Sequence, residues 1–284
     1  MAAMSALDLR PLSMGDVADR AFAVYRARWL VLSAIGAVSF GLFFFGWFVA
    51  ATYAAAFFNE VDASLFILLF AAVGLALFTA LIAGALIDAT AATHLGRSRG
   101  IVMSLGVGLR TAPRILLTEL PVAVVPFVGW LLAWSVLNLT ESLAAAGLAS
   151  LIGTIAIIYI EASWFVAPAV ATVEHQGPIA SLRRAWQLTT GFRWRIVGLA
   201  VLALVLFATG FASVFSLTAT AGVGAGDGMA ATVPPLLLFC ALVGAWLPFF
   251  FGTMTVVYYD LRVRKEGLDL QLSAEAMRST GDAI

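Results

Sequence analysis

Residues 26–57 read RARWLVLSAIGAVSFGLFFFGWFVAATYAAAF, a short basic cluster followed by a long apolar run that carries no charge. A helix of about 20 such residues crosses the hydrocarbon core of a membrane. Five more apolar runs of comparable length follow along the chain. The pattern predicts six membrane-spanning helices, near Leu30–Phe57, Ser64–Thr93, Ile115–Leu137, Leu148–Val173, Ile196–Leu217 and Val233–Tyr259.

The composition of the whole chain agrees with an integral membrane protein. Of its 284 residues, 62% are hydrophobic and only 11% are charged, whereas soluble domains have about 25% charged residues. The single cysteine, Cys240, excludes an intrachain disulfide. No phosphate-binding loop, zinc-protease motif or dinucleotide fingerprint occurs, and we expect no metal, no cofactor and no nucleic acid partner.

The charges alternate along the chain. All 16 Lys and Arg residues lie before the first apolar run, in the second and fourth connections between runs, or after the last run. The charged residues of the first, third and fifth connections are all acids. Short loops rich in Lys and Arg stay cytoplasmic, so both termini are predicted to be cytoplasmic. The basic clusters are Arg10, Arg20, Arg26, Arg28; Arg97, Arg99, Arg110, Arg114; Arg183, Arg184, Arg193, Arg195; and Arg262, Arg264, Lys265, Arg278. The acids are Glu60, Asp62, Glu141 and Asp227.

The start of the chain and its residue usage suggest where the protein resides. The first apolar run follows an acid-containing segment and is too long for a cleavable signal peptide, so we expect it to remain as an anchor. The basic residues are almost all Arg, and Ala and Gly are abundant. This usage favours a GC-rich bacterial genome, and hence the bacterial inner membrane.

A short amphipathic segment precedes the first, third and fifth apolar runs. Each segment has apolar residues at helical spacing, and at least one arginine lies between each segment and the apolar run that follows it. Because each unit then contains two spans, the three segments lie on one membrane face. We predict an all-α integral membrane fold, with six transmembrane helices as three parallel repeats of an amphipathic helix plus a two-span hairpin. The segments are Leu12–Tyr25, Ile101–Ala112 and Gly177–Gly191; the repeats cover about 10–97, 98–176 and 177–267; and residues 268–284 are a cytoplasmic tail of the single membrane domain 1–284.

The basic residues around these segments are candidate contacts for lipid or for a partner protein. Anionic lipids attract each base near the membrane surface by roughly 1 kcal/mol. The alternative is that the bases only determine topology. The candidates are Arg20, Arg26, Arg28, Arg110, Arg114, Arg183, Arg184, Arg193, Arg195, Arg262, Arg264 and Lys265.

Three acids, Asp88, Glu119 and Glu161, lie within the apolar runs. A charge at the membrane centre costs at least about 2.5–3.5 kcal/mol, so such residues usually face the bundle interior with a partner. Glu161 is about 18 Å from the inner end of its run, at a rise of about 1.5 Å per residue. The acids could bind a proton or cation on a transport path, or they could be protonated or Arg-paired structural residues.

Gly96–Gly100 matches the G-x-S-x-G pattern of serine hydrolases, with Ser98 at its centre. That motif functions on a turn between a strand and a helix, with a histidine and an acid nearby. Here it joins two predicted helices between arginines. The only histidines, His94 and His175, each follow an even-numbered run. We therefore expect no catalytic residue in this chain.

Three stretches resemble the bacterial membrane-domain family named after glycerophosphoryl diester phosphodiesterases. They are Arg10–Arg20 (RPLSMGDVADR), Ala167–Val170 (APAV) with Glu174–Leu188, and Tyr258–Asp269 (YYDLRVRKEGLD). The resemblance implies a multi-span helical module, attached to a phosphodiesterase domain in some proteins and alone in others. It implies no active-site residue here, because the family's catalytic domain is a TIM barrel for which this chain has no room.

Two functions remain open from the sequence. The first is a non-catalytic inner-membrane protein that binds anionic lipid or a membrane-protein partner through its cytoplasmic face. The alternative is a small-solute or ion transporter or channel that uses Glu161 with Asp88 or Glu119. The sequence indicates neither the partner nor the oligomeric state.

Overall fold

The computed structural model describes residues 11–58, 60–140, 142–222, 229–268 and 270–271, and all regular elements in these ranges are helices. Six segments are long and apolar enough to cross a membrane, as the sequence predicts. Arg10, Glu141, Asp227 and Arg278 lie outside the described residues. The helices are α1 (Met14–Ala27), α2 (Trp29–Phe57), α3 (Glu60–His94), α4 (Ile101–Thr140), α5 (Leu143–Trp164), α6 (Ala167–Val173), α7 (Pro178–Thr189), α8 (Arg193–Gly222) and α9 (Met229–Glu266).

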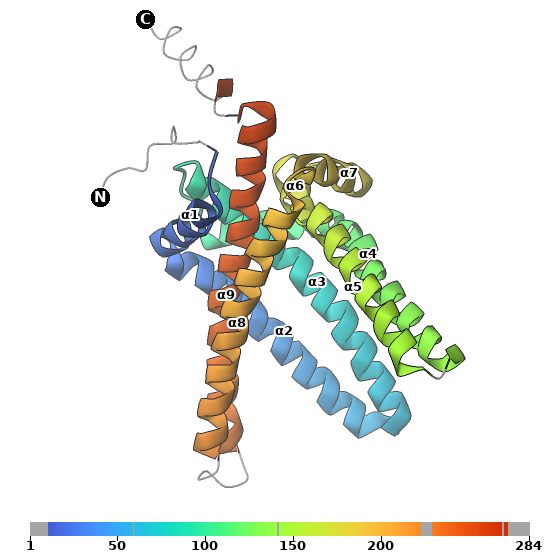
Figure 1. The fold of residues 1–284 in the computed structure, drawn as a ribbon. Coiled ribbons are helices and arrows are strands. Elements are labelled where there is room, and N and C mark those ends of the chain that lie inside the picture. The colour runs from blue at the N-terminus through green and yellow to red at the C-terminus, as the bar shows by residue number, and fades with distance from the viewer. Residues whose placement is uncertain (1–10, 59, 141, 223–228, 269, 272–284) are drawn as a thin grey trace, which may run out of the picture.

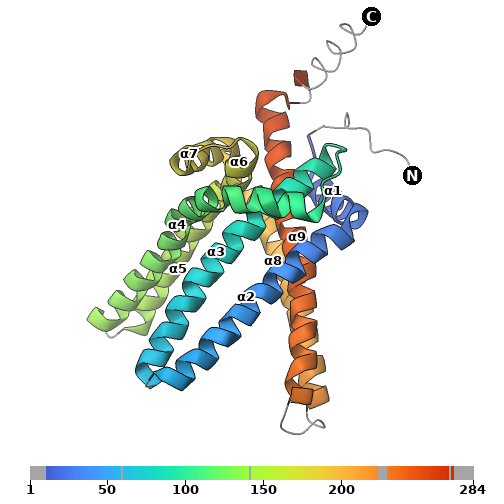
Figure 2. The ribbon, with the colours of Figure 1, turned by 180° about the vertical axis from the view of Figure 1, so that it is seen from behind.

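The long helices form three hairpins, α2 with α3, α4 with α5, and α8 with α9 (Figure 1). The hairpins converge at the end that carries α1, α6 and α7 and diverge toward the opposite end, as both views show (Figure 2). Every Lys and Arg that the structure describes lies on or beside the elements at the converging end. We call this the basic end.

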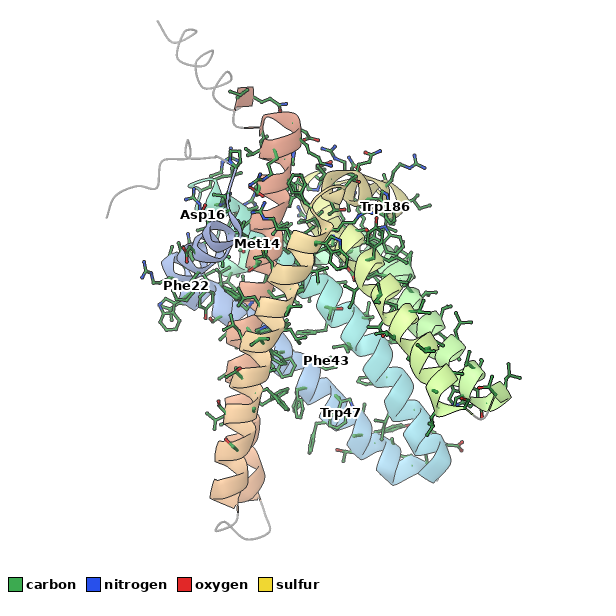
Figure 3. The ribbon with its side chains drawn as sticks, viewed as in Figure 1. Met14, Asp16, Phe22, Phe43, Trp47 and Trp186 are labelled. Carbon is green, nitrogen blue, oxygen red and sulfur yellow. The ribbon has the colours of Figure 1, made fainter. Side chains whose placement is uncertain are left out.

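Helix α1 is short, amphipathic and packed against the bundle. The Ser13 side chain accepts from the Asp16 backbone, and the Asp16 side chain accepts from the Ser13 backbone, a capping box that fixes where the helix starts. Val17, Ala21 and Val24 are buried on one face. Phe22, on the other face, points away from the bundle (Figure 3).

Helix α4 joins two elements that the sequence separates. The predicted amphipathic segment Ile101–Ala112 is its first part, and the third apolar run is the remainder. The first part lies across the end of α3, and the helix then turns downward to run beside α5 (Figure 2). Pro113 lies inside α4, and because proline has no N–H it cannot bond the carbonyl four residues earlier, which lets a helix bend.

The fourth apolar run is divided where the sequence predicts one span. Helix α5 ends at Trp164, and the short α6 begins at Ala167. Pro168 is one of the first residues of α6, and it cannot donate to the carbonyl of Trp164, which favours a break there. The break brings α6 into the core, where Val170 is fully buried.

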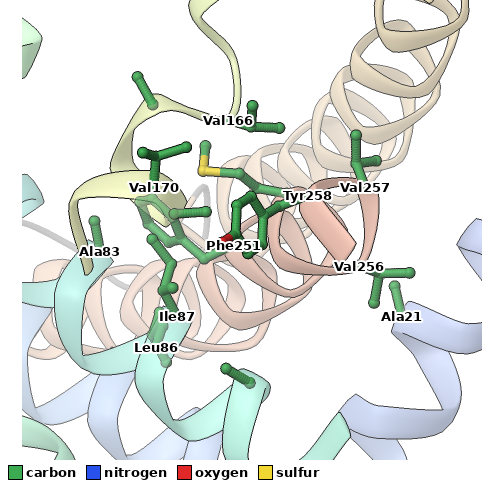
Figure 4. Packing of buried hydrophobic residues seen from close by; sticks show 14 of the residues in the cluster. Ala21, Ala83, Leu86, Ile87, Val166, Val170, Phe251, Val256, Val257 and Tyr258 are labelled. Carbon is green, nitrogen blue, oxygen red and sulfur yellow. The ribbon is translucent and has the colours of Figure 1, made fainter. Parts of the chain in front are cut away.

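The core lies toward the basic end, where α3, α6 and α9 meet (Figure 4). Ile87, Val170 and Tyr258 are among its fully buried side chains. The α3–α4 crossing depends on two glycines. A Cβ on Gly108 would lie 3.0 Å from the Ala85 nitrogen, and a Cβ on Gly84 would lie 3.0 Å from the Gly108 Cα, so the two backbones are nearly in contact.

Candidate functional site at the basic end

A buried carboxylate on α9 binds the segment before α1 to two helices. Asp260 has a 2% exposed side chain, and its Oδ2 lies 2.8 Å from Arg195 Nη1 and 3.0 Å from Arg264 Nε. The Leu12 nitrogen donates to Asp260 Oδ1 over 2.7 Å. Both arginines also donate to the Leu12 carbonyl oxygen. Arg195 and Arg264 therefore share one acid, Asp260, and together they join α8, α9 and the segment before α1.

A second network joins α9 to the segment between α6 and α7. The Tyr258 hydroxyl donates to Glu174 Oε1 over 2.8 Å and accepts from Arg262 over 3.2 Å. Arg184, on α7, pairs with both Glu174 and Glu266. Arg262 also pairs with Glu266, at 2.9 Å. These two arginines, like the pair around Asp260, have acidic partners within the protein.

Arg193 and Lys265 are held by other means. The Arg193 guanidinium carbon lies 4.1 Å from the ring centre of Trp186 and 4.5 Å from that of Tyr159, between two aromatic faces. Arg193 also donates to the Tyr159 hydroxyl. Stacking of this kind stabilises a cation away from water. Lys265 donates to the Gln187 carbonyl over 2.6 Å.

A further group of arginines at the basic end has side chains that make no hydrogen bond or ion pair to any residue that the structure describes. These unpaired arginines are Arg26, Arg97, Arg110, Arg114 and Arg183. Arg20 does not belong to this group, because it is half-buried on α1 and interacts electrostatically with His94.

Asp88 lies in a pocket of about 520 Å³ at the basic end. Its side chain is 14% exposed, with Oδ2 3.7 Å from Arg99 Nε and 3.2 Å from Ser104 Oγ on α4. The pocket lies between the end of α3, the first part of α4 and the end of α6 with the segment that follows it. Its charged or titratable lining residues are Asp88, Arg97, Arg99, Arg110, Arg114 and His175.

Glu119 and Glu161 share a second cavity, of about 590 Å³, which the sequence does not predict. It lies between the α4–α5 hairpin and helices α8 and α9. Its other lining residues are almost all apolar, for example Ile157, Val201 and Phe250. Neither acid has a hydrogen bond or ion pair to any described residue, and Arg114 is therefore not a partner of Glu119. Asp88 is not part of this cavity.

The G-x-S-x-G segment forms the connection between α3 and α4. Ser98 is exposed there, and Gly96, two residues earlier, has a left-handed backbone with φ 72°. The His94 ring is buried and stacks on Tyr259 with 5.2 Å between ring centres. Within the described ranges, Ser98 has no hydrogen bond to either histidine. The geometry offers no activated nucleophile at this serine.

No family model matches this chain, and no curated protein or solved structure matches it either. Among the described residues, no three His, Cys, Asp or Glu side chains gather as a metal site would require.

Several residues of the two networks are not among the candidates from the sequence. Asp260 and Arg264, like Arg262 and Glu266, have the i, i+4 spacing that favours ion pairs on one helix. That spacing could have identified both pairs. The partners Glu174 and Leu12 lie far away along the chain, and no local pattern points to them.

Proposed function

We propose that this chain is a multi-pass protein of the bacterial inner membrane that binds anionic lipid headgroups through its basic end and has no catalytic activity of its own. The three hairpins are its spans, three parallel repeats place their Arg-bearing segments on one face, and the positive-inside rule makes the basic end cytoplasmic. Large apolar side chains such as Leu42, Phe45 and Phe48 on α2 are exposed, which suits contact with lipid tails.

The observation that carries the proposal is the division of the arginines. Arg184, Arg195, Arg262 and Arg264 are ion-paired with acids within the protein. Topology alone needs only positive charge in the loops, whether or not that charge has a partner. The unpaired arginines remain available to an external anion, and a guanidinium donates two parallel hydrogen bonds to phosphate.

The family resemblance supports the same end of the molecule. Residues from the three matching stretches meet there, through Leu12 with Asp260 and through Glu174 with Tyr258. We propose membership of the phosphodiesterase-associated membrane-domain family on this basis. A protein partner with an acidic surface is the competing ligand, because it would use the same arginines.

Quenching of tryptophan fluorescence by brominated lipids tests the lipid proposal. Trp29 and Trp194 are exposed at the basic end, beside Arg28 and Arg195. In mixed vesicles, brominated phosphatidylglycerol should quench more strongly than brominated phosphatidylcholine, and high salt should reduce the difference. The double variant Arg26→Gln, Arg183→Gln should weaken the preference, by about fivefold for each arginine near the surface.

The charge-retaining double variant Arg26→Lys, Arg183→Lys is the matched control and should keep most of the preference. Arg184→Gln is unsuitable for this purpose, because it also breaks the ion pairs with Glu174 and Glu266. An equal quenching by both lipids in the unmodified protein would contradict lipid binding and favour the acidic protein partner.

A second candidate function, transport of a cation or proton, is supported by the shared cavity of Glu119 and Glu161. Two carboxylates in an apolar cavity between helices are typical of ion pathways. In proteoliposomes, Glu161→Gln and Glu119→Gln should each abolish cation-coupled flux, whereas Asp88→Asn should not, because Asp88 lines the other pocket. Flux that equals that of protein-free vesicles, or is unchanged in both Glu variants, excludes this candidate.

A further inference from the structure

The pocket that contains Asp88 concentrates positive charge in a concave site. It is lined by residues from the end of α3, the first part of α4, the end of α6 and the segments that follow α3 and α6, and its volume is about 520 Å³. Pockets of roughly 300–1,000 Å³ hold small organic ligands. We call it the arginine pocket; its arginine lining residues are Arg97, Arg99, Arg110 and Arg114, and His175 also lines it.

The charge inside this pocket is not balanced by the protein. Asp88 is the only acid in the lining, and its close contact is with Arg99, at 3.7 Å. Arg97, Arg110 and Arg114 have no hydrogen bond or ion pair to any residue within the described ranges. Like charges gathered in one concavity repel each other, and an anion bound between them offsets that repulsion.

The walls of the pocket are held in place by contacts that do not involve these three arginines. Gly108 packs against the backbone of Leu81 and Ala85, which fixes the first part of α4 on α3. The Arg28 guanidinium donates to the Arg99 carbonyl over 2.8 Å, so the connection between α3 and α4 is anchored to the end of α1. A ligand would therefore meet a largely preformed site, and little binding energy would be spent on ordering it.

We infer that the arginine pocket is a discrete binding site for a phosphate group. This inference deepens the proposed function, on which it rests, by placing one saturable site within a broader lipid-contacting surface. Several guanidinium groups around one concavity match the charge and the hydrogen-bonding geometry of a phosphate monoester or diester. The phosphate can belong to a lipid headgroup, since the pocket lies where the long helices end, or to a soluble anion.

Native mass spectrometry of the detergent-solubilised full chain, titrated with phosphatidylglycerol, counts the bound lipids. The double variant Arg110→Gln, Arg114→Gln removes two exposed, unpaired arginines from the pocket. It should lose one saturable lipid, with affinity at least about tenfold weaker, given roughly 1 kcal/mol for each base. The double variant Arg26→Gln, Arg183→Gln removes the same charge outside the pocket and should keep that lipid.

A parallel titration with inorganic phosphate, followed by the thermal shift of the same four proteins, separates the sources. The four are the unmodified chain, the two double variants and the pocket variant Arg110→Lys, Arg114→Lys, which keeps the charge and serves as a folding control. A shift with phosphate that only Arg110→Gln, Arg114→Gln abolishes supports a soluble anion; a saturable lipid without such a shift supports a headgroup.

If Arg110→Gln, Arg114→Gln and Arg26→Gln, Arg183→Gln weaken lipid binding equally, the inference of a discrete phosphate site in the pocket is wrong. The broader preference for anionic lipid would still stand. A saturable lipid that survives Arg110→Gln, Arg114→Gln unchanged would also overturn the inference of a discrete site. The proposed function is instead contradicted when the unmodified protein shows no quenching preference for phosphatidylglycerol. The two failures therefore appear in different proteins and in different measurements.

Discussion

Arg195 of α8 and Asp260 of α9 form an ion pair, with 2.8 Å between Nη1 and Oδ2, that also fixes the backbone of Leu12 in front of α1. Three segments from the beginning, the last third and the end of the chain therefore meet at one carboxylate. The arrangement makes Asp260 a structural centre of the basic end, and it separates the arginines that build this end from those that are free to bind.

The first prediction concerns Asp260 itself. Asp260→Asn leaves Arg195 and Arg264 without their acid, and removing one partner of a buried pair costs about 3–5 kcal/mol. We expect the lower end of that range, because both arginines keep some exposure. The measurement is the melting temperature of the purified protein in detergent. Asp19→Asn, an exposed change on α1, is the control and should leave it unchanged.

The second prediction concerns the hydroxyl of Tyr258. Tyr258→Phe removes a donor to Glu174 and an acceptor for Arg262 in a fully buried position. A hydrogen bond to a charged group contributes about 1.5–3 kcal/mol, so denaturant unfolding should show a loss of that size. Tyr53→Phe, at an exposed position of α2, should cost nothing measurable. If Tyr53→Phe lowers the free energy of unfolding as much as Tyr258→Phe does, the effect at Tyr258 does not come from its hydrogen bond to Glu174.

The third prediction concerns the crossing of α3 and α4. A Cβ on Gly108 would press on the Leu81 carbonyl and the Ala85 backbone, so Gly108→Ala should destabilise the fold by about 1–3 kcal/mol. Gly106, on the same helix, has nothing within 4 Å of a Cβ. Gly106→Ala should therefore be neutral or stabilising by about 0.5–1 kcal/mol. Thermal melting of both variants in detergent decides the matter, and equal effects would contradict the close crossing.

The fourth prediction compares two arginines that the sequence places in one group. Arg193→Gln removes the cation between Tyr159 and Trp186, an interaction of up to about 2 kcal/mol when shielded from water. We expect faster limited proteolysis around α7 and a lower melting temperature. Arg183→Gln, at an exposed and unpaired position on α7, should change neither measurement.

The long helices were predictable from local sequence. Six apolar runs predict six long helices, and the structure has six segments of that kind. The starts of α1 and α7 also follow from local residues, since Ser13 with Asp16 caps α1 and Gly177 with Pro178 begins α7. These features depend on hydropathy and capping over a few neighbouring residues, so no knowledge of the partners was required.

The breaks and bends were less predictable. Proline positions indicate where a helix is weakened, but Pro113 bends α4 without ending it, whereas Pro168 accompanies a complete break between α5 and α6. The outcome depends on what surrounds the freed carbonyl. Packing of α6 into the core, with Val170 buried, is a tertiary contact that the sequence pattern does not contain.

The placement of the bases at alternate ends of the spans, and of three acids within apolar runs, can be read from the order of residues alone. The order of residues does not show which arginines have partners, nor that Glu119 and Glu161 share a cavity while Asp88 lies in the arginine pocket. These arrangements depend on residues that are distant along the chain. The Leu12–Asp260 hydrogen bond joins residues 248 positions apart, and contacts of that kind follow from how helices pack rather than from any local pattern.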